Sequence, residues 1–312
     1  MAGKEGGGRT GEDQCAFCPE PPVIRSGSGE RLCARHLTAD IERRVRDNLR
    51  VTRGIAPGDH VAVALSGGKD SSCMLLILNR ILGEWADASI TAITIDEGIA
   101  GYRDGTIRAA CSLTRRLGVR HHVTSFSELF GHDLDHFLQG REQRACTICG
   151  VLRRRALADA ARSVGAARIA TGHNLDDEAQ SVLMNILRGD LARLAQDSTT
   201  GLPGCFLPRI KPLSVISERE VFTYLLVKGC YTDLPECPYA RSALRSEVRA
   251  MLDELEYRHP GTRESLIRSR DAIRKQVGPA SLPGDLHACQ SCGAMCSGEL
   301  CQACRTLRSL GI

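Results

Sequence analysis

A short apolar segment runs directly into two glycines and a helix, and this junction constrains the fold more than any other feature. Residues 60–65 (His-Val-Ala-Val-Ala-Leu) lack helical spacing and suit a buried parallel strand. Gly67 and Gly68 follow, and residues 70–82 have the apolar spacing of a helix that ends near Gly83. This strand-to-helix junction is typical of α/β folds.

The same alternation recurs along the chain. We expect further strands at residues 90–95, 120–124 and 168–171, and helices near 41–50, 102–117, 150–163, 175–187 and 217–228. Beyond Gly189 the pattern loosens, with two more helices before about Arg274. The alternation predicts a doubly wound parallel sheet, which binds ligands at the carboxyl ends of its strands. The loops after Leu65, Ile95 and Thr171 should therefore face one cleft.

A chain of 312 residues is long enough for one large core with small attachments. We predict an N-terminal metal module at residues 1–40, a catalytic domain at 41–280 and a C-terminal metal module at 281–312. No apolar run approaches the roughly 18 to 20 residues of a membrane span, and residues 1–10 lack the apolar stretch of a signal peptide. We therefore expect a cytosolic protein that does not associate with membranes.

The segment from Ser66 to Ser71 (Ser-Gly-Gly-Lys-Asp-Ser) supplies what a polyphosphate needs. Two glycines let the backbone approach closely, successive N–H groups and the positive end of the helix face the anion, and Lys69 adds a donor. The segment is not a Walker loop, because Val63 occupies the first glycine position and Asp70 follows the lysine.

Carboxylates follow two other predicted strands. Asp96 ends the second strand, and Asp176 and Asp177 follow Thr171-Gly172-His173-Asn174 before a helix. Carboxylates at strand ends can hold the Mg²⁺ that accompanies a nucleotide triphosphate. Asp176 and Asp177 also suit a helix cap and first-turn charge, so both interpretations stay open.

Fifteen cysteines in a long chain without an export signal indicate metal or redox chemistry rather than a disulfide scaffold. Four cysteines near the C terminus form two Cys-x-x-Cys pairs, a spacing typical of a structural zinc site. A matching set near the N terminus has a histidine as its fourth ligand. The predicted zinc ligands are Cys15, Cys18, Cys33 and His36 at one end, and Cys289, Cys292, Cys301 and Cys304 at the other.

The central set has only three members. Cys146 and Cys149 are expected just before a helix, and their one evident partner is Cys237 in a separate loop. Three soft ligands suit an active centre with one open coordination position. An iron-sulfur cluster, a persulfide-carrying pair of cysteines with lowered pKa values, and a zinc site with a fourth ligand not evident from the sequence are the three alternatives.

Residues 141–155 contain five arginines and a single acidic residue, so this segment can attract a phosphate backbone, although a basic solvated helix face would look the same.

With these motifs the chain resembles the PP-loop ATP pyrophosphatases, and among them the TtuA and cytosolic thiouridylase family of tRNA 2-thiouridine sulfurtransferases. The Ser66–Ser71 loop, the Thr171–Asp177 segment, Cys146-Thr-Ile-Cys149-Gly before an arginine-rich helix and both terminal metal sets carry the resemblance. Some T-loop enzymes of the family use a catalytic lysine where this chain has Arg153, and that difference favours the branch that modifies the wobble uridine.

The resemblance implies specific roles for residues of this chain. A 4Fe-4S cluster would be held by Cys146, Cys149 and Cys237, which act in catalysis together with Lys69, Asp70 and Asp177. Arg153, Arg154 and Arg155 would contact tRNA. The residues implied to bind ATP are Ala64, Ser66, Gly67, Gly68, Lys69, Asp70, Ser71, Asp96, Gly172 and Asp177.

The expected reaction uses ATP and Mg²⁺ to adenylate the C2 carbonyl oxygen of a tRNA uridine, which sulfur then replaces with the help of the cluster. The sulfur donor is sulfide or a thiocarboxylated ubiquitin-like protein, and the resemblance also implies a homodimer. The alternatives are thiolation of a T-loop uridine, thiolation of a cytidine, and a non-catalytic zinc-ribbon RNA-binding protein.

Overall fold

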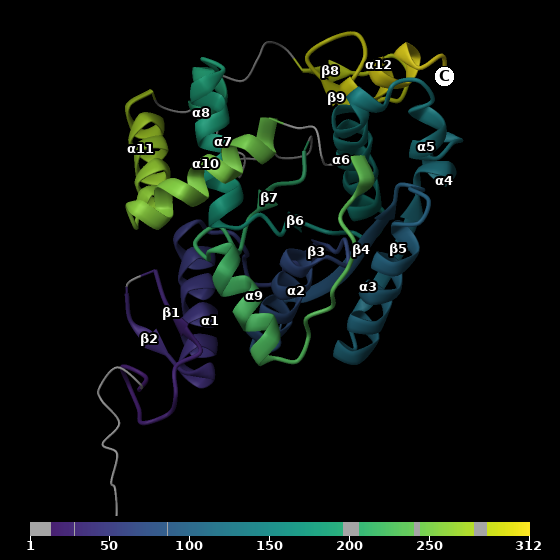
Figure 1. Ribbon diagram of the computed structural model, residues 1–312. Helices are drawn as coiled ribbons and strands as arrows, with labels where there is room; N and C mark the ends of the chain where they lie inside the picture. The colour runs from purple at the N-terminus through teal and green to yellow at the C-terminus, as the bar shows by residue number, and fades with distance from the viewer. Residues whose placement is uncertain (1–13, 28, 86, 196–205, 240–243, 278–285) are drawn as a thin grey trace, which may run out of the picture.

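The computed structural model describes residues 14–27, 29–85, 87–195, 206–239, 244–277 and 286–312 (Figure 1). At its centre lies a five-stranded sheet in the order β5-β4-β3-β6-β7. All four strand pairings are parallel. The predicted doubly wound parallel sheet is therefore confirmed. Its strands are β3 (His60–Ala64), β4 (Ser89–Asp96), β5 (Arg120–Ser125), β6 (Arg168–Ala170) and β7 (Arg209–Ile210).

Helices cover both faces of the sheet. Those nearest to it are α1 (Ala34–Val51), α2 (Lys69–Leu82), α3 (Arg103–Leu117), α6 (Ala145–Ser163) and α9 (Glu218–Val227). A cluster of α7 (Leu175–Leu187), α8 (Leu191–Ala195), α10 (Leu244–Arg258) and α11 (Thr262–Val277) packs to one side. Short helical segments are α4 (Phe126–Phe130), α5 (Leu134–Phe137) and the 3-10 turn η2 (Glu142–Arg144).

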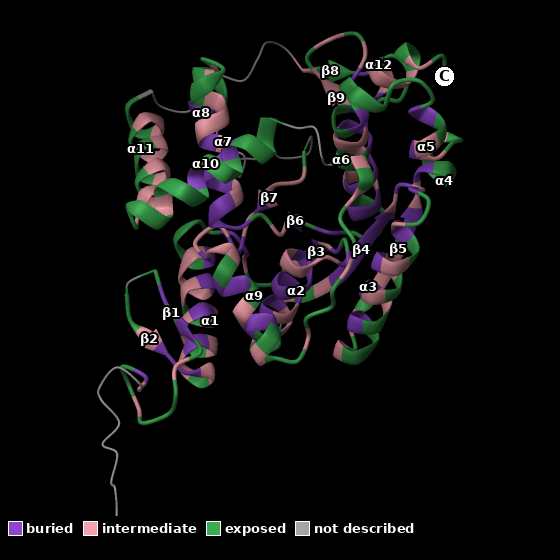
Figure 2. Cartoon of the chain, in the orientation of Figure 1, coloured by how far each residue is buried: buried purple, intermediate pink, exposed green. Residues whose placement is uncertain are grey.

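The alternation of side chains along β3 explains the two layers of core. Val61 and Val63 point into an apolar cluster formed with α1, α2, α3 and α9, whereas Ala62 belongs to a second cluster that contains α4, α5 and α6. Figure 2 shows buried residues along β4 and on one side of α1. Both faces of the central strands are thus covered, as the uninterrupted apolar character of residues 61–65 requires.

A small cysteine-rich unit lies near each end of the chain. The N-terminal one pairs β1 (Ile24–Arg25) with β2 (Arg31–Leu32) and leads directly into α1. The C-terminal one pairs β8 (His287–Ala288) with β9 (Met295–Cys296) and ends in α12 (Gln302–Ser309), next to α6 (Figure 1).

Two local predictions are wrong. The cysteine pair does not precede the helix, because α6 begins at Ala145 and places Cys146 and Cys149 in its first two turns. The chain after Gly189 also forms a fifth strand, β7, which carries no apolar run. Among the described residues, no helix is both long and apolar enough to cross a membrane.

Candidate functional site

The loop between β3 and α2 is closely packed and internally hydrogen-bonded. Gly67 has φ +88°, and a Cβ atom there would lie 2.0 Å from the carbonyl oxygen of Thr106. The Gly68 N–H donates to Ser66 Oγ at 3.3 Å, and Ser71 Oγ donates to the Gly68 carbonyl at 3.0 Å. Gly68 is the N-cap of α2 and contributes no side-chain cap. The first N–H groups of α2 are therefore preorganised for an anion.

Gly67→Ala should abolish nucleotide binding, because the new methyl group must displace backbone rather than a flexible side chain, at a φ that L-residues avoid. We expect at least about a 100-fold loss of ATP affinity, equivalent to about 2.7 kcal/mol, measured by calorimetry. Gly118→Ala is the control, since Gly118 also has positive φ but open space around its Cα. Equal losses in the two variants would contradict this account of the loop.

The loop after β6 contacts the Ser66–Ser71 loop. A Cβ on Gly172 would lie 3.0 Å from the Ser71 nitrogen, so the two loops meet closely at this point. Asn174 caps α7 and donates from Nδ2 to Asp70 Oδ1 at 2.8 Å. Since β3 and β6 flank the position where the order of the strands reverses, these loops occupy the place where such sheets bind ligands.

The two neighbouring aspartates at the start of α7 have different environments. Asp177 completes a capping box with Asn174 and also faces solvent-filled space at the site. Asp176 is buried, accepts from the Glu218 N–H at 2.8 Å and lies 3.1 Å from Arg263 Nε. Burial raises the pKa of Asp176. Asp176 thus serves the packing of α9 and α11, whereas Asp177 has a carboxylate available to a ligand.

The three loops after β3, β4 and β6 enclose a cavity of about 530 Å³, in the size range of a nucleotide site. Residues implied to bind ATP that line it are Ala64, Ser66, Asp70, Ser71, Gly172 and Asp177. Six basic side chains also line it: Arg103, Arg153, Arg154, Arg209, Lys211 and Arg245. Such an excess of cations suits a polyanionic ligand.

The cations within this cleft are crowded. Burial, and then the neighbouring Arg154, lower the pKa of Arg209, and burial and Arg153 do the same for Arg154. Arg209 donates to the backbone carbonyl of Arg154 at 3.4 Å rather than to a carboxylate. A bound phosphate would relieve this repulsion.

Glu97, rather than Asp96, faces the cleft. Asp96 accepts from the Gly98 N–H at 2.9 Å and so shapes the turn after β4. Glu97 is buried, with Oε2 2.7 Å from Arg103 Nε, although these atoms are not aligned for a hydrogen bond. Arg103 also donates to the carbonyls of Ile95 and Ser66, which fixes the ends of β3 and β4 relative to each other.

Lys211, at the end of β7, lines the cleft and pairs with the buried carboxylate of Glu178 at 2.6 Å. Arg270 approaches the other oxygen of Glu178 at 2.8 Å. Burial alone would raise the pKa of Glu178, but these two cations lower it below its usual 4.5. The stability that Glu178 contributes is therefore present above pH 4.5 and lost as the pH falls through its lower folded-state pKa.

Glu178→Gln should reduce the free energy of unfolding at neutral pH by about 3 kcal/mol, because two half-buried cations lose their buried anion. It should also weaken the decline of stability below pH 4.5. Urea unfolding at several pH values measures both effects. Glu254→Gln removes an exposed pair with Arg258 and is the control expected to change little. Parallel pH profiles for wild type and Glu178→Gln would refute the assignment.

A second, larger cavity of about 1140 Å³ adjoins the cleft. Cys146 and Cys237 line it, together with Gly68 and Lys69 of the phosphate loop. Lys69 Nζ lies 3.0 Å from Asp70 and 2.8 Å from Glu218. Three residues line both cavities: Asp70, Asp177 and Arg245. We call the 530 Å³ cavity the phosphate cleft and the 1140 Å³ cavity the cysteine groove. Because they share these three residues, they are two halves of one site.

The third central cysteine, Cys149, is not among the residues that line this groove. Burial first, then the carboxylate of Glu97 and the thiols of Cys237 and Cys146, raise the pKa of Cys149 to about 11, despite the nearby Arg153. The lowered pKa expected for a persulfide pair is thus wrong for Cys149. Across the described residues, these three sulfurs are not gathered within 4.8 Å as the two terminal sets are. The thiols of Cys146 and Cys237 are nonetheless near enough to act on the pKa of Cys149, so the three suit a ligand set around a cluster rather than around a single ion.

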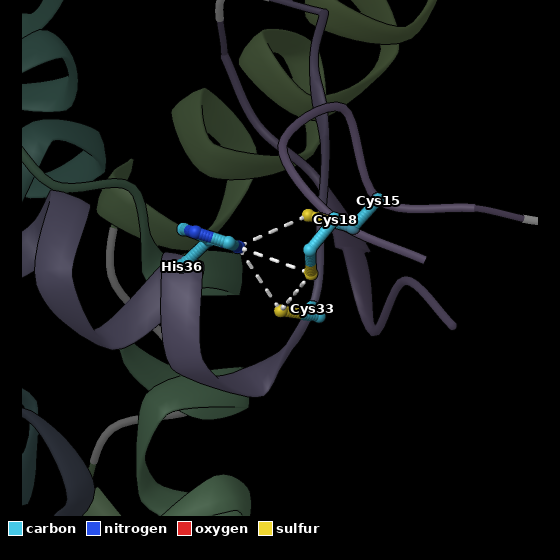
Figure 3. Close-up of side chains that lie close together, drawn as sticks. All are labelled: Cys15, Cys18, Cys33 and His36. Atoms are coloured by element: carbon cyan, nitrogen blue, oxygen red, sulfur yellow. Dashed lines mark hydrogen bonds between the residues drawn. The ribbon is translucent and has the colours of Figure 1, made fainter. Parts of the chain in front are cut away.

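The N-terminal set is gathered tightly enough for one ion (Figure 3). His36 Nδ1 lies 3.3 to 3.5 Å from all three sulfurs, and Cys18 Sγ lies 3.6 Å from Cys33 Sγ. Burial opposes ionisation of Cys15, yet the N–H groups of Phe17 and Cys33 and the His36 ring lower its pKa to about 6. Tetrahedral zinc, with Zn–S of about 2.3 Å, places its sulfurs about 3.8 Å apart. These residues fit zinc.

The C-terminal set has the same compactness. All four sulfurs lie within 4.8 Å of one another, and Cys292 Sγ is 3.7 Å from Cys301 Sγ. The N–H of Cys301 donates to Cys289 Sγ at 3.2 Å and is the main reason that the pKa of Cys289 falls to about 6. This set also fits a structural zinc ion.

The three consecutive arginines of α6 point to different places. Arg153 and Arg154 line the cleft. Arg155 instead contacts Asp159 at 2.5 Å and donates to Cys292 Sγ at 2.9 Å. A role in tRNA binding stays a prediction for all three.

Four residues of the site were not predicted from the sequence: Glu97, Arg103, Arg209 and Arg245. Arg209 could have been predicted from Lys211. The two residues flank Ile210 at the end of a strand, and residues two positions apart in a strand point to the same face. Arg103 and Arg245 lie on helices without a distinguishing local pattern.

Comparisons with known proteins agree with this geometry. A PP-loop domain family matches residues 37–280. The tRNA 2-thiolation protein NcsA of Haloferax volcanii is 35% identical over 95% of this chain and 99% of its own length. Cytoplasmic tRNA 2-thiolation protein 1 of Bos taurus is 39% identical over 95% of this chain and 88% of its own.

Among solved structures, the U34-tRNA thiolase NcsA of Methanococcus maripaludis with its 4Fe-4S cluster superposes with a TM-score of 0.83 and 32% identity. It covers 96% of this chain and 97% of its own. The chain therefore belongs to the PP-loop family of archaeal and eukaryotic tRNA 2-thiolation proteins.

Proposed function

We propose that this chain is an ATP-dependent tRNA thiolase that converts U34 of tRNA to 2-thiouridine in the cytoplasm, as the names of its relatives imply. The observation that carries the proposal is the junction of the two cavities at Asp70, Asp177 and Arg245. A base held at this junction could react with a nucleotide on one side and with sulfur on the other.

In this proposal ATP lies in the cleft. The N–H groups at the start of α2, the hydroxyls of Ser66 and Ser71 and the surrounding arginines hold the phosphates. Asp70 and Asp177 provide the carboxylates for Mg²⁺. Lys69, positioned by Asp70 and Glu218, lies on the groove side, where it can stabilise charge on the departing pyrophosphate.

The uridine enters unstacked, and its C2 oxygen attacks the α-phosphate of ATP. The new O–P bond forms as the bond to pyrophosphate breaks, and the N3 proton leaves to solvent. Sulfide then adds to C2, the C2–O bond breaks, and AMP departs with the former uridine oxygen. Cys146, Cys149 and Cys237 would hold a 4Fe-4S cluster, which when bound would supply the sulfide to the base. Cys146 and Cys237 line the cysteine groove, so the sulfur would reach the base from that side of the site.

The proposed partners are tRNA, a sulfur donor and a second copy of the chain. Arg153 and Arg154 would hold the tRNA backbone at the mouth of the cleft, and Arg155 would add positive charge to the same helix. The sulfur donor is sulfide or a thiocarboxylated ubiquitin-like protein, and the active form is a homodimer. The three predicted segments, residues 1–40, 41–280 and 281–312, would act as zinc module, catalytic domain and second zinc module.

Mass spectrometry of tRNA nucleosides from cells that lack the gene tests the proposal. We expect 2-thiouridine to disappear from position 34 and to return with the wild-type gene but not with Cys146→Ala. Loss of a T-loop thiouridine or of 2-thiocytidine would assign the protein to another substrate. Unchanged tRNA would refute an enzymatic role in thiolation.

A further inference from the structure

The contact between Arg155 and the C-terminal cysteines connects α6, which carries Cys146 and Cys149, to the C-terminal metal set. Arg155 lies on α6 six residues after Cys149, and its Nη1 donates to Cys292 Sγ at 2.9 Å and lies 3.8 Å from Cys301 Sγ. Its Nε is held by Asp159, one turn further along α6. The guanidinium thus lies between Asp159 of its own helix and two sulfurs of the C-terminal metal set.

Apolar packing also joins the C-terminal metal set to α6. Cys289 and Cys301, with 3% and 9% of their surface exposed, belong to the same buried cluster as Ile148 and Leu152 of α6. Leu307 of α12 packs against that cluster as well. Figure 1 shows the module of β8, β9 and α12 seated on α6. The metal set therefore forms part of the core that surrounds the helix carrying Cys146 and Cys149.

A Cys₄ zinc site carries a net negative charge, because four thiolates outweigh one divalent ion. A guanidinium that donates to one of those thiolates reduces this charge and fixes the orientation of the sulfur. Outer contacts of this kind are worth about 10 to 100-fold in metal affinity. Arg155 satisfies the geometry for such a contact, and its partner Asp159 orients it.

We propose that Arg155 is a positioning residue that joins the C-terminal zinc site to α6, so that this zinc ion holds the helix of Cys146 and Cys149 in place. The inference rests on the proposed function only for the role of those two cysteines. It gives the C-terminal module a scaffolding role in the sulfur half of the site.

Zinc release from the full chain into a colorimetric chelator tests the first part. In Arg155→Gln we expect one of the two zinc equivalents to leave at least about tenfold faster, with the other unchanged. Arg155→Lys, which keeps a donor and a charge, should recover part of the difference. Release of both equivalents at the wild-type rate in Arg155→Gln would overturn the proposal.

A control separates this contact from general effects. Arg154→Gln removes the same charge from the adjacent residue of α6. It should release zinc within about threefold of the wild type, well below the 10 to 100-fold of a lost outer contact. Equal acceleration in Arg154→Gln would show that helix charge, not the contact with Cys292, is responsible.

Cobalt substitution provides a spectroscopic test. Loss of the N–H···S contact should shift the sulfur-to-cobalt charge-transfer band of the Cys₄ site in Arg155→Gln and leave it unchanged in Arg154→Gln. Hydrogen exchange tests the link to α6: zinc loss from the C-terminal site should increase exchange at residues 145–152 but not at 75–82 of α2. Unchanged exchange in α6 would refute the scaffolding role, whereas absence of thiolation activity would not affect this test.

Discussion

Replacing Cys237 by Ala should lower the rate of tRNA thiolation by at least about 100-fold, since even a lost outer-shell contact costs a metal site about 10 to 100-fold and this change removes a direct ligand. The protein should also lose iron and acid-labile sulfide after anaerobic reconstitution. ATP affinity should remain within about threefold of wild type, because Cys237 lines the groove and not the phosphate cleft. Thiolation assays, iron analysis and calorimetry measure the three effects.

Cys111→Ala is the matched control. Cys111 is also half-buried, but it lies on α3 near His121, away from the groove. It should keep its iron and its activity. A Cys237→Ala protein that thiolates tRNA at the wild-type rate would refute the assignment of the three central cysteines.

Replacing Asp177 by Asn should lower the rate of catalysis strongly and the stability of the fold only slightly. The loss of a carboxylate for Mg²⁺ should lower ATP-dependent pyrophosphate release by about 100-fold, a loss of about 2.7 kcal/mol in transition-state stabilisation. The free energy of unfolding should fall by no more than about 1 kcal/mol, since the capping contribution of Asp177 is of that size. Pyrophosphate release and urea unfolding give both values.

The neighbouring Asp176→Asn should show the opposite pattern. Its carboxylate is buried against Arg263 and the Glu218 N–H, so its loss should cost about 3 kcal/mol of stability. Pyrophosphate release at a temperature where the variant is folded should change little. If both variants lose only stability, the carboxylate of Asp177 has no chemical role.

The sequence predicted those parts of the structure that depend on local spacing. The strand-to-helix junctions follow from apolar patterns of a few residues. The terminal metal sets follow from ligand pairs separated by two residues, because such pairs bring their atoms together in a tight turn. The bounds of β3, β4 and α2 agree with the prediction to within one residue.

Features that depend on tertiary packing were missed. The strand β7 has two residues, and its apolar Ile210 is buried because β6 and a core cluster from distant parts of the chain lie beside it. Gly150 suggested a helix start, yet α6 extends through it to Ala145, since the buried Ile148 anchors the first turns. The sequence also could not indicate whether Asp96 or Glu97 faces the cleft, because adjacent residues at a strand end point in opposite directions.

The fate of the uridine oxygen tests the central claim most directly. Transfer RNA with ¹⁸O at C2 of U34 would be incubated anaerobically with reconstituted protein, ATP, Mg²⁺ and sulfide, and the products examined by mass spectrometry. If the cleft activates the base by adenylation, one ¹⁸O atom appears in AMP for each 2-thiouridine formed. Label found in water or in inorganic phosphate instead, with unlabelled AMP, would contradict adenylation of the base in this site.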